Sequence, residues 1–244
     1  MGLFDLLRKK KLPPGDPKTQ KAGVRLINKN VEAASRFEAA DDLGRIGTGE
    51  ALRCLLQRFT VVIGGATPDE DEKDRVRKIL IQAGSNAIEP ILRFLKEEET
   101  VGQALEILKE LSDETGYLDR LLSVTESFDP FHSKYPDKKI QVFREIGRYV
   151  DPRIRERLTP FLEDDDDDIR IAAIGAVSRQ GEDDIIREVM IQAILDNDER
   201  PRVKLAACDA LCDAGWDVRG FRKRIESTLP DSFTINRKGQ LQRR

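Results

Sequence analysis

Residues that build catalytic or metal centres are scarce in this sequence. It has one histidine, His132, and one tryptophan, and aromatic residues make up only 6% of it. One histidine cannot supply a metal site that needs several, and neither a nucleophile-elbow motif nor a phosphate-binding loop of the Walker type occurs. We therefore predict a protein that is not an enzyme and that uses no cofactor and no metal.

Cysteine is equally rare, with Cys54, Cys208 and Cys212 as the three examples. They are too few and too scattered for a disulfide framework or a zinc site. Cys208 and Cys212 are one helical turn apart on an apolar face, so we expect core residues, with a redox or ligand pair as the alternative. Such cysteine usage indicates a reducing, cytoplasmic compartment.

Long apolar runs are absent as well. No stretch approaches the roughly 20 apolar residues that a membrane-spanning helix needs. Segment 1–11 lacks the layout of a signal peptide, because its basic residues follow the apolar ones. Position 6 is leucine, where a myristoylation motif needs serine or threonine. We expect a soluble, unprocessed protein.

Charge, in contrast, is abundant and unevenly distributed. Charged residues make up 36% of the chain, against about 25% in an ordinary domain, which suits the large surface of an elongated array. Residues 1–29 and 219–244 each carry a net charge of +6, whereas residues 30–218 carry −15. An acidic body argues against DNA binding by that body, because duplex affinity depends on neutralising phosphates.

Two segments 34 positions apart are similar to each other. Residues 169–181 read IRIAAIGAVSRQG, and residues 203–215 read VKLAACDALCDAG. Both follow acidic residues, and both precede a second amphipathic helix. Weaker copies complete a series of about six helix pairs: 31–47 with 49–63, 73–84 with 87–95, 101–111 with 117–124, and 140–150 with 154–162.

This pattern of Asp, Ile-Arg, Ala-Ala, Ala-Val and Gly resembles the HEAT-repeat family, most clearly in residues 164–215. The resemblance implies an all-α fold, a right-handed α-solenoid of about six antiparallel helix pairs whose inner helices line a concave face. Stacking is also physically required, because one pair cannot bury its own apolar stripe. We assign residues 17–229 to the solenoid, 1–16 to a basic amphipathic segment with a linker, and 230–244 to a short, basic, non-helical tail.

Several loops and turns carry local expectations. Segment 64–72 is predicted to be a flexible loop, and the acidic run 163–168 a solvated loop that caps the following helix. Arg170, Arg202 and Lys204 are expected to pair with acidic residues of the neighbouring turn. Glycines in the left-handed conformation are expected near the turns within pairs: Gly47, Gly84, Gly116, Gly181 and Gly215.

The period breaks at residues 127–139, which contain Phe128, Phe131, His132 and Tyr135. Aromatic residues on a loop that rigid helices hold in place are typical of interfaces. The alternative is that Phe128 and Phe131 fill the seam between the third and fourth helix pairs. We predict that this loop binds a partner protein.

Both ends of the chain offer further candidates. Leu3, Phe4 and Leu7 form an apolar patch beside basic residues 8–11, which suits docking on an anionic membrane or in a partner groove; packing on the first repeat and disorder are the alternatives. Trp216 is expected to line a pocket or to fill the seam to the last helix. The tail at 230–244 is predicted to form a strand and turn that folds back on the acidic body, or to reach a nucleic acid or an acidic protein.

These features favour a cytoplasmic, non-catalytic scaffold or adaptor. We expect a protein partner and a monomeric chain, with peripheral contact at the inner face of a membrane through residues 1–11 as an open possibility. The alternatives are a nucleic-acid-binding repeat protein that uses its basic tails, and an accessory protein with repeats similar to those of the chromophore lyases of light-harvesting complexes.

Overall fold

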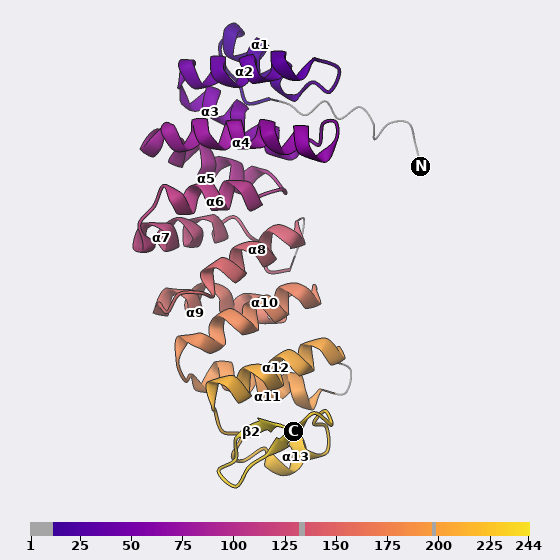
Figure 1. Cartoon of the computed structure of the whole chain (residues 1–244). Coiled ribbons are helices and arrows are strands. Elements are labelled where there is room, and N and C mark those ends of the chain that lie inside the picture. The colour runs from indigo at the N-terminus through magenta and orange to yellow at the C-terminus, as the bar shows by residue number, and fades with distance from the viewer. Residues whose placement is uncertain (1–11, 132–134, 197–198) are drawn as a thin grey trace. The chain divides into compact units, whose positions relative to one another are not determined.

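The computed structural model describes residues 12–131, 135–196 and 199–244 (Figure 1). The chain divides into two compact units, Met1–Tyr117 (unit 1) and Leu118–Arg244 (unit 2). The boundary lies inside helix α7 (Glu114–Thr125). No helix in the described part of the chain combines the length and apolar character needed to cross a membrane.

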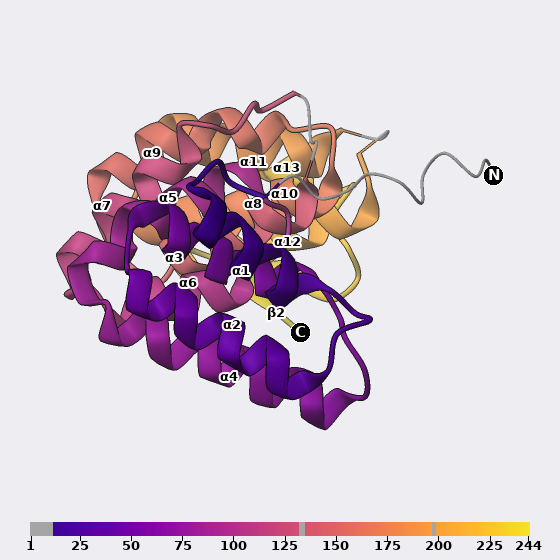
Figure 2. The same cartoon turned by 90° about the horizontal axis from the view of Figure 1, so that it is seen from above.

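Unit 1 consists of two layers of helices. In one layer α2 packs on α4 and α4 on α6, and in the other α1 packs on α3 and α3 on α5. Helices α2 and α4 lie one above the other in Figure 1 and run in nearly the same direction in Figure 2. The helices are α1 (Pro17–Ile27), α2 (Ala33–Ile46), α3 (Gly49–Leu56), α4 (Ala66–Gln82), α5 (Ile88–Glu97) and α6 (Gly102–Glu110). Fully buried leucines from both layers fill the core: Leu43, Leu55, Leu80, Leu95 and Leu108.

Unit 2 repeats this arrangement. Helix α10 packs between α8 and α12, while α9 packs on α10, and α11 packs on α12 and α13. The helices are α8 (Pro136–Ile146), α9 (Pro152–Leu158), α10 (Asp167–Val177), α11 (Asp184–Leu195), α12 (Pro201–Ala214) and α13 (Arg222–Glu226). The predicted fold class, an all-α solenoid of helix pairs, is confirmed, and the handedness of the stack stays a prediction.

Polar side chains cap the N-termini of several helices. Asp16 accepts hydrogen bonds from the backbone N–H groups of Lys18 (2.9 Å) and Thr19 (3.2 Å), and Pro17 occupies the first turn of α1. Such a cap satisfies amides that have no partner within the helix. Helix α1 was not predicted, although this signal is present in the sequence.

The turn glycines were predicted correctly with one exception. Gly47, Gly84, Gly181 and Gly215 have φ between 61° and 87°, a region that residues with a Cβ avoid. Gly116 is different: it lies in the first turn of α7, where its N–H donates to Asp113 Oδ1 at 2.9 Å. It therefore belongs to a helix start and does not close a turn.

The prediction of a flexible loop at 64–72 is wrong for most of that segment. Helix α4 begins at Ala66, and the side chains of Asp69 and Glu72 are buried. The dense negative charge of segment 64–72 is typical of a solvent-exposed loop. Here the buried side chains of Arg36 and Arg58 neutralise the charge of Asp69 and Glu72.

The C-terminal tail forms a small antiparallel hairpin of β1 (Phe233–Ile235) and β2 (Leu241–Arg243), in which Phe233 lies opposite Arg243. The predicted strand and turn are therefore confirmed. The hairpin also folds back on the acidic body, because the Arg243 guanidinium lies 2.6 Å from both Asp209 Oδ1 and Asp213 Oδ1 of α12.

Candidate functional site

The aromatic loop of unit 2 has one ring that belongs to the core. Phe128 is half-buried, and its ring centroid lies 6.1 Å from that of Phe143. Phe143 is fully buried and packs edge-on against Phe161 at 4.9 Å. Such tilted pairs are favourable ring contacts. Phe128 therefore fills a seam at α8, as the alternative interpretation of this loop expected.

Phe131 behaves differently, because 54% of it is exposed. Its backbone N–H donates to Asp129 Oδ1 at 3.0 Å, which fixes a tight turn just before the ring. The interpretation that it fills a seam is therefore wrong for Phe131. Tyr135, at the other end of the loop, is half-buried with its ring centroid 5.0 Å from Lys138 Nζ. His132 lies outside the described residues.

A buried lysine holds the loop on the helices. Lys139 of α8 is 3% exposed, and its Nζ lies 3.0 Å from Asp164 Oδ2, which is buried as well. The same Nζ donates to the backbone carbonyl of Asp129 and lies 5.1 Å from the Phe161 ring centroid. Lys139 thus links the turn before Phe131 to the body of unit 2. Removing one partner of such a buried ion pair is strongly destabilising, because the other charge is left buried without a counter-charge.

Asp166 and Asp168 of the acidic run 163–168 stabilise the repeat. Asp166 accepts hydrogen bonds from the N–H groups of Asp168 (2.9 Å) and Ile169 (3.2 Å) and so caps α10. Arg170 pairs with Glu199 at 2.8 Å, and Arg202 pairs with Asp168, as predicted. The predicted pair of Lys204 is not found among the described residues. Among the described residues, no group of three or more His, Cys, Asp or Glu side chains is placed to hold a metal ion.

A groove of about 630 Å³ lies between α10 and α12. Trp216, 5% exposed, is part of its lining. Asp209 and Asp213 line the groove too, and Arg243 holds both carboxylates. The hydrogen bond from Arg243 lowers the pKa of Asp213.

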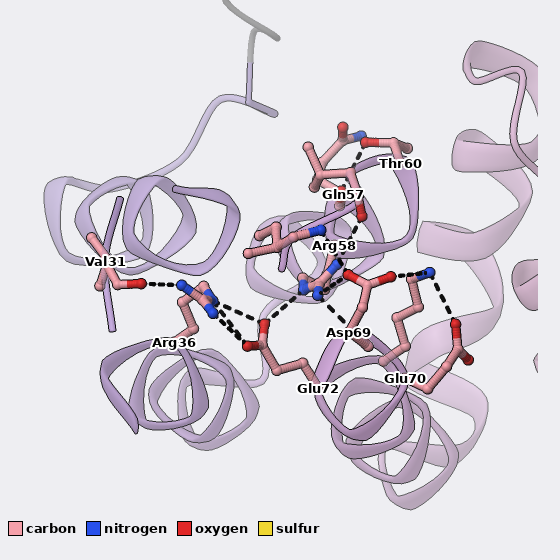
Figure 3. Close-up of polar contacts among 11 residues, drawn as sticks. Val31, Arg36, Gln57, Arg58, Thr60, Asp69, Glu70 and Glu72 are labelled. Carbon is pink, nitrogen blue, oxygen red and sulfur yellow. Dashed lines mark hydrogen bonds and ion pairs between the residues drawn. The ribbon is translucent and has the colours of Figure 1, made fainter. Parts of the chain in front are cut away.

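Unit 1 contains a buried charge network that sequence reasoning missed (Figure 3). Glu72 of α4 lies between two arginines: Arg36 Nη2 is 2.7 Å from Glu72 Oε1, and Arg58 Nε is 3.0 Å from Glu72 Oε2. Arg58, which is fully buried, also donates from Nη2 to Asp69 Oδ1 at 2.6 Å. Burial by itself would raise the pKa of Asp69, but hydrogen bonds from Lys73 and Arg58 lower it to about 2.

This network is satisfied internally and thus has a structural role. Arg58 Nη1 donates to the Val61 carbonyl at 2.8 Å, Arg36 Nη1 donates to the Val31 carbonyl, and Asp69 Oδ1 accepts the N–H of Ile63 at 2.9 Å. The contacts join α2, the turn after α3, and α4. The partners are 14 and 36 positions from Glu72 in the sequence, so no local motif identifies them.

The cysteines do not form a reactive pair. Burial raises the pKa of Cys54 to about 11 and that of Cys208 to about 12, which keeps both as thiols. Cys212 is half-buried. The core role expected of Cys208 and Cys212 is confirmed for Cys208, which is buried, but only in part for Cys212. Leu3, Phe4 and Leu7, the N-terminal candidates, lie outside the described residues, so membrane or partner docking by segment 1–11 stays a prediction.

Comparison with known protein families gives one match. Residues 131–212, from Phe131 through most of α12, match the family model of the HEAT repeats. No curated protein matches the sequence. The matched segment includes the first copy of the repeat recognised in the sequence, residues 169–181, and most of the second, residues 203–215. Residues 131–212 are therefore assigned to the HEAT repeats.

Proposed function

We propose that this protein is a non-catalytic scaffold that binds a partner protein through the loop at residues 127–139 and the adjoining surface of unit 2. HEAT repeats generally mediate protein–protein interaction, so the class of function follows from the family. The site within the repeats and the scaffold role are our inference.

One observation supports this site above the others: Phe131 is exposed directly after a segment that is anchored on the helices of unit 2. Phe128 anchors the loop on Phe143, and Lys139 anchors the Asp129 carbonyl. A large aromatic side chain on a rigid frame loses little conformational entropy on binding, and such residues dominate the binding energy of interfaces.

Nucleic-acid binding by the basic tails has less support. Arg243 is committed to Asp209 and Asp213, and Arg222 pairs with Glu226 at 2.8 Å. These contacts neutralise part of the positive charge that a phosphate backbone would require. We place the scaffold in the cytoplasm, because the three cysteines are free.

The test is affinity capture from native extract with the intact chain and with Phe131→Ala. Val150→Ala is the matched control, since Val150 is a large apolar side chain in unit 2 that is 79% exposed. We expect Phe131→Ala to weaken capture of a stoichiometric partner by about 30-fold or more, the effect of losing a hot-spot residue worth about 2 kcal/mol. Thermal unfolding of both variants should match that of the parent.

Unchanged capture by Phe131→Ala would exclude this site. Recovery of nuclease-sensitive material alone would favour the tails and the nucleic-acid alternative.

A further inference from the structure

Unit 2 has a second surface that the aromatic loop does not use. A groove of about 710 Å³ runs along α11. Its walls include Leu162 and Glu163 from the turn after α9, Arg170 from α10, and Arg224 from α13. None of the aromatic residues of the loop at 127–139 lines it.

The α11 side of the groove is an apolar stripe. Ile185, Val189 and Ala193 follow one another at intervals of four residues, so they share one face of the helix. Ile185 is 69% exposed, and Val189 and Ala193 are half-buried. From Ile185 to Ala193 the stripe extends over roughly 12 Å, which matches about two turns of a helix laid along it.

The rim of the groove is acidic. Four acidic and two basic side chains line it, a net charge of −2. Glu163 and Glu188 are exposed, and within the described ranges neither carboxylate takes part in a hydrogen bond or an ion pair. Arg170 is already held by Asp167 (2.7 Å) and Glu199 (2.8 Å).

This charge selects the kind of partner. Nucleic acids and anionic lipid surfaces carry phosphate charge that the two glutamates repel. Lysine or arginine side chains beside an apolar face complement both the rim and the stripe. An amphipathic helix in a hydrophobic groove is a common mode of peptide recognition.

We propose that the α11 groove binds a basic amphipathic helix of a partner protein. The apolar face of that helix covers Ile185, Val189 and Ala193, and its cationic residues face Glu163 and Glu188. The inference deepens the proposed protein-binding function, on which it rests, but it uses a surface separate from Phe131.

The experiment measures fluorescence anisotropy of a labelled 14-residue peptide of leucine and lysine, designed as an amphipathic helix, titrated with the full chain. The test variant carries Glu163→Lys and Glu188→Lys. The control variant carries Glu156→Lys and Asp231→Lys, which change two exposed carboxylates of unit 2 outside the groove by the same total charge. Ile185→Asp tests the apolar stripe.

We expect the test variant and Ile185→Asp each to weaken peptide binding by about tenfold or more, and the control variant to change it less than twofold. Phe131→Ala should leave peptide binding unchanged, so that failure here and failure of the aromatic-loop proposal are distinguishable. A glutamate version of the peptide should not bind.

Three results would overturn the proposal. One is equal weakening by the test and control variants, which indicates attraction to net charge alone. Another is binding of the glutamate peptide as tight as that of the lysine peptide. The third is the absence of peptide binding to the parent chain at millimolar concentration. All substituted side chains are exposed, so circular dichroism should show the same helix content in every variant.

Discussion

Replacing Glu72 with glutamine removes one negative charge from between two buried guanidinium groups. The carboxylate is 2% exposed and receives three hydrogen bonds from Arg36 and one from Arg58. In the variant the carboxylate of Asp69 still pairs with Arg58, but one acceptor oxygen at position 72 becomes an NH₂ donor that faces a guanidinium. Breaking a buried ion pair by removing one partner costs about 3–5 kcal/mol.

That cost is a large share of the roughly 5–15 kcal/mol that stabilises a typical domain. We therefore expect the Glu72→Gln variant to unfold at a markedly lower urea concentration, as followed by far-UV circular dichroism. Glu70→Gln is the control two positions away: Glu70 is 60% exposed and pairs with Lys73 alone among the described residues. Its replacement should cost less than about 1 kcal/mol. Equal midpoints for the two variants would refute the structural role of the network.

Three further predictions concern other parts of the chain. Phe143→Ala should destabilise unit 2 by about 3–5 kcal/mol, measured by urea unfolding with tryptophan fluorescence, because it leaves a cavity between two packed rings; a loss under 1 kcal/mol would contradict this. The folded protein lowers the pKa of Asp69 from 3.8 to about 2, so the ionised carboxylate stabilises the folded state by roughly 2 kcal/mol. This contribution is present above pH 4 and is lost as the pH falls toward 2. The free energy of unfolding of the Asp69→Asn variant should change less with pH over that range than that of the parent chain. Equal pH dependence in the two proteins would refute this role of Asp69. A thiol reagent at pH 8 should modify Cys212 first, whereas Cys54 and Cys208 should react only on unfolding, as mass spectrometry after brief labelling would show.

Much of the fold could be predicted because the repeat produces a regular spacing of apolar residues within short segments of the sequence. The match between 169–181 and 203–215 identified α10 and α12, and the same spacing located the helices upstream of them. The C-terminal strand and turn were predictable from alternating apolar residues and a turn sequence. These signals depend on neighbours in the sequence, so a single sequence contains them.

The predictions were wrong where contacts between residues far apart in the sequence determine which side chains are buried. Segment 64–72 is dense in acids, and only the arginines at positions 36 and 58, brought close by folding, make its burial in α4 favourable. The difference between Phe128 and Phe131 has the same origin. Both aromatics occupy one loop, but Phe143 covers the first, while the Asp129 turn directs the second outward. The α11 groove depends on four separate segments and could not be read from any of them.

In the proposed function the protein contacts its partner through Phe131. Replacing Phe131 with the photoreactive analogue p-benzoylphenylalanine and irradiating the chain in native extract tests this directly, with the same analogue at Val150 as the control. We expect one discrete protein adduct from position 131 that is absent from position 150. The same adducts from both positions, or none from position 131, would contradict the claim.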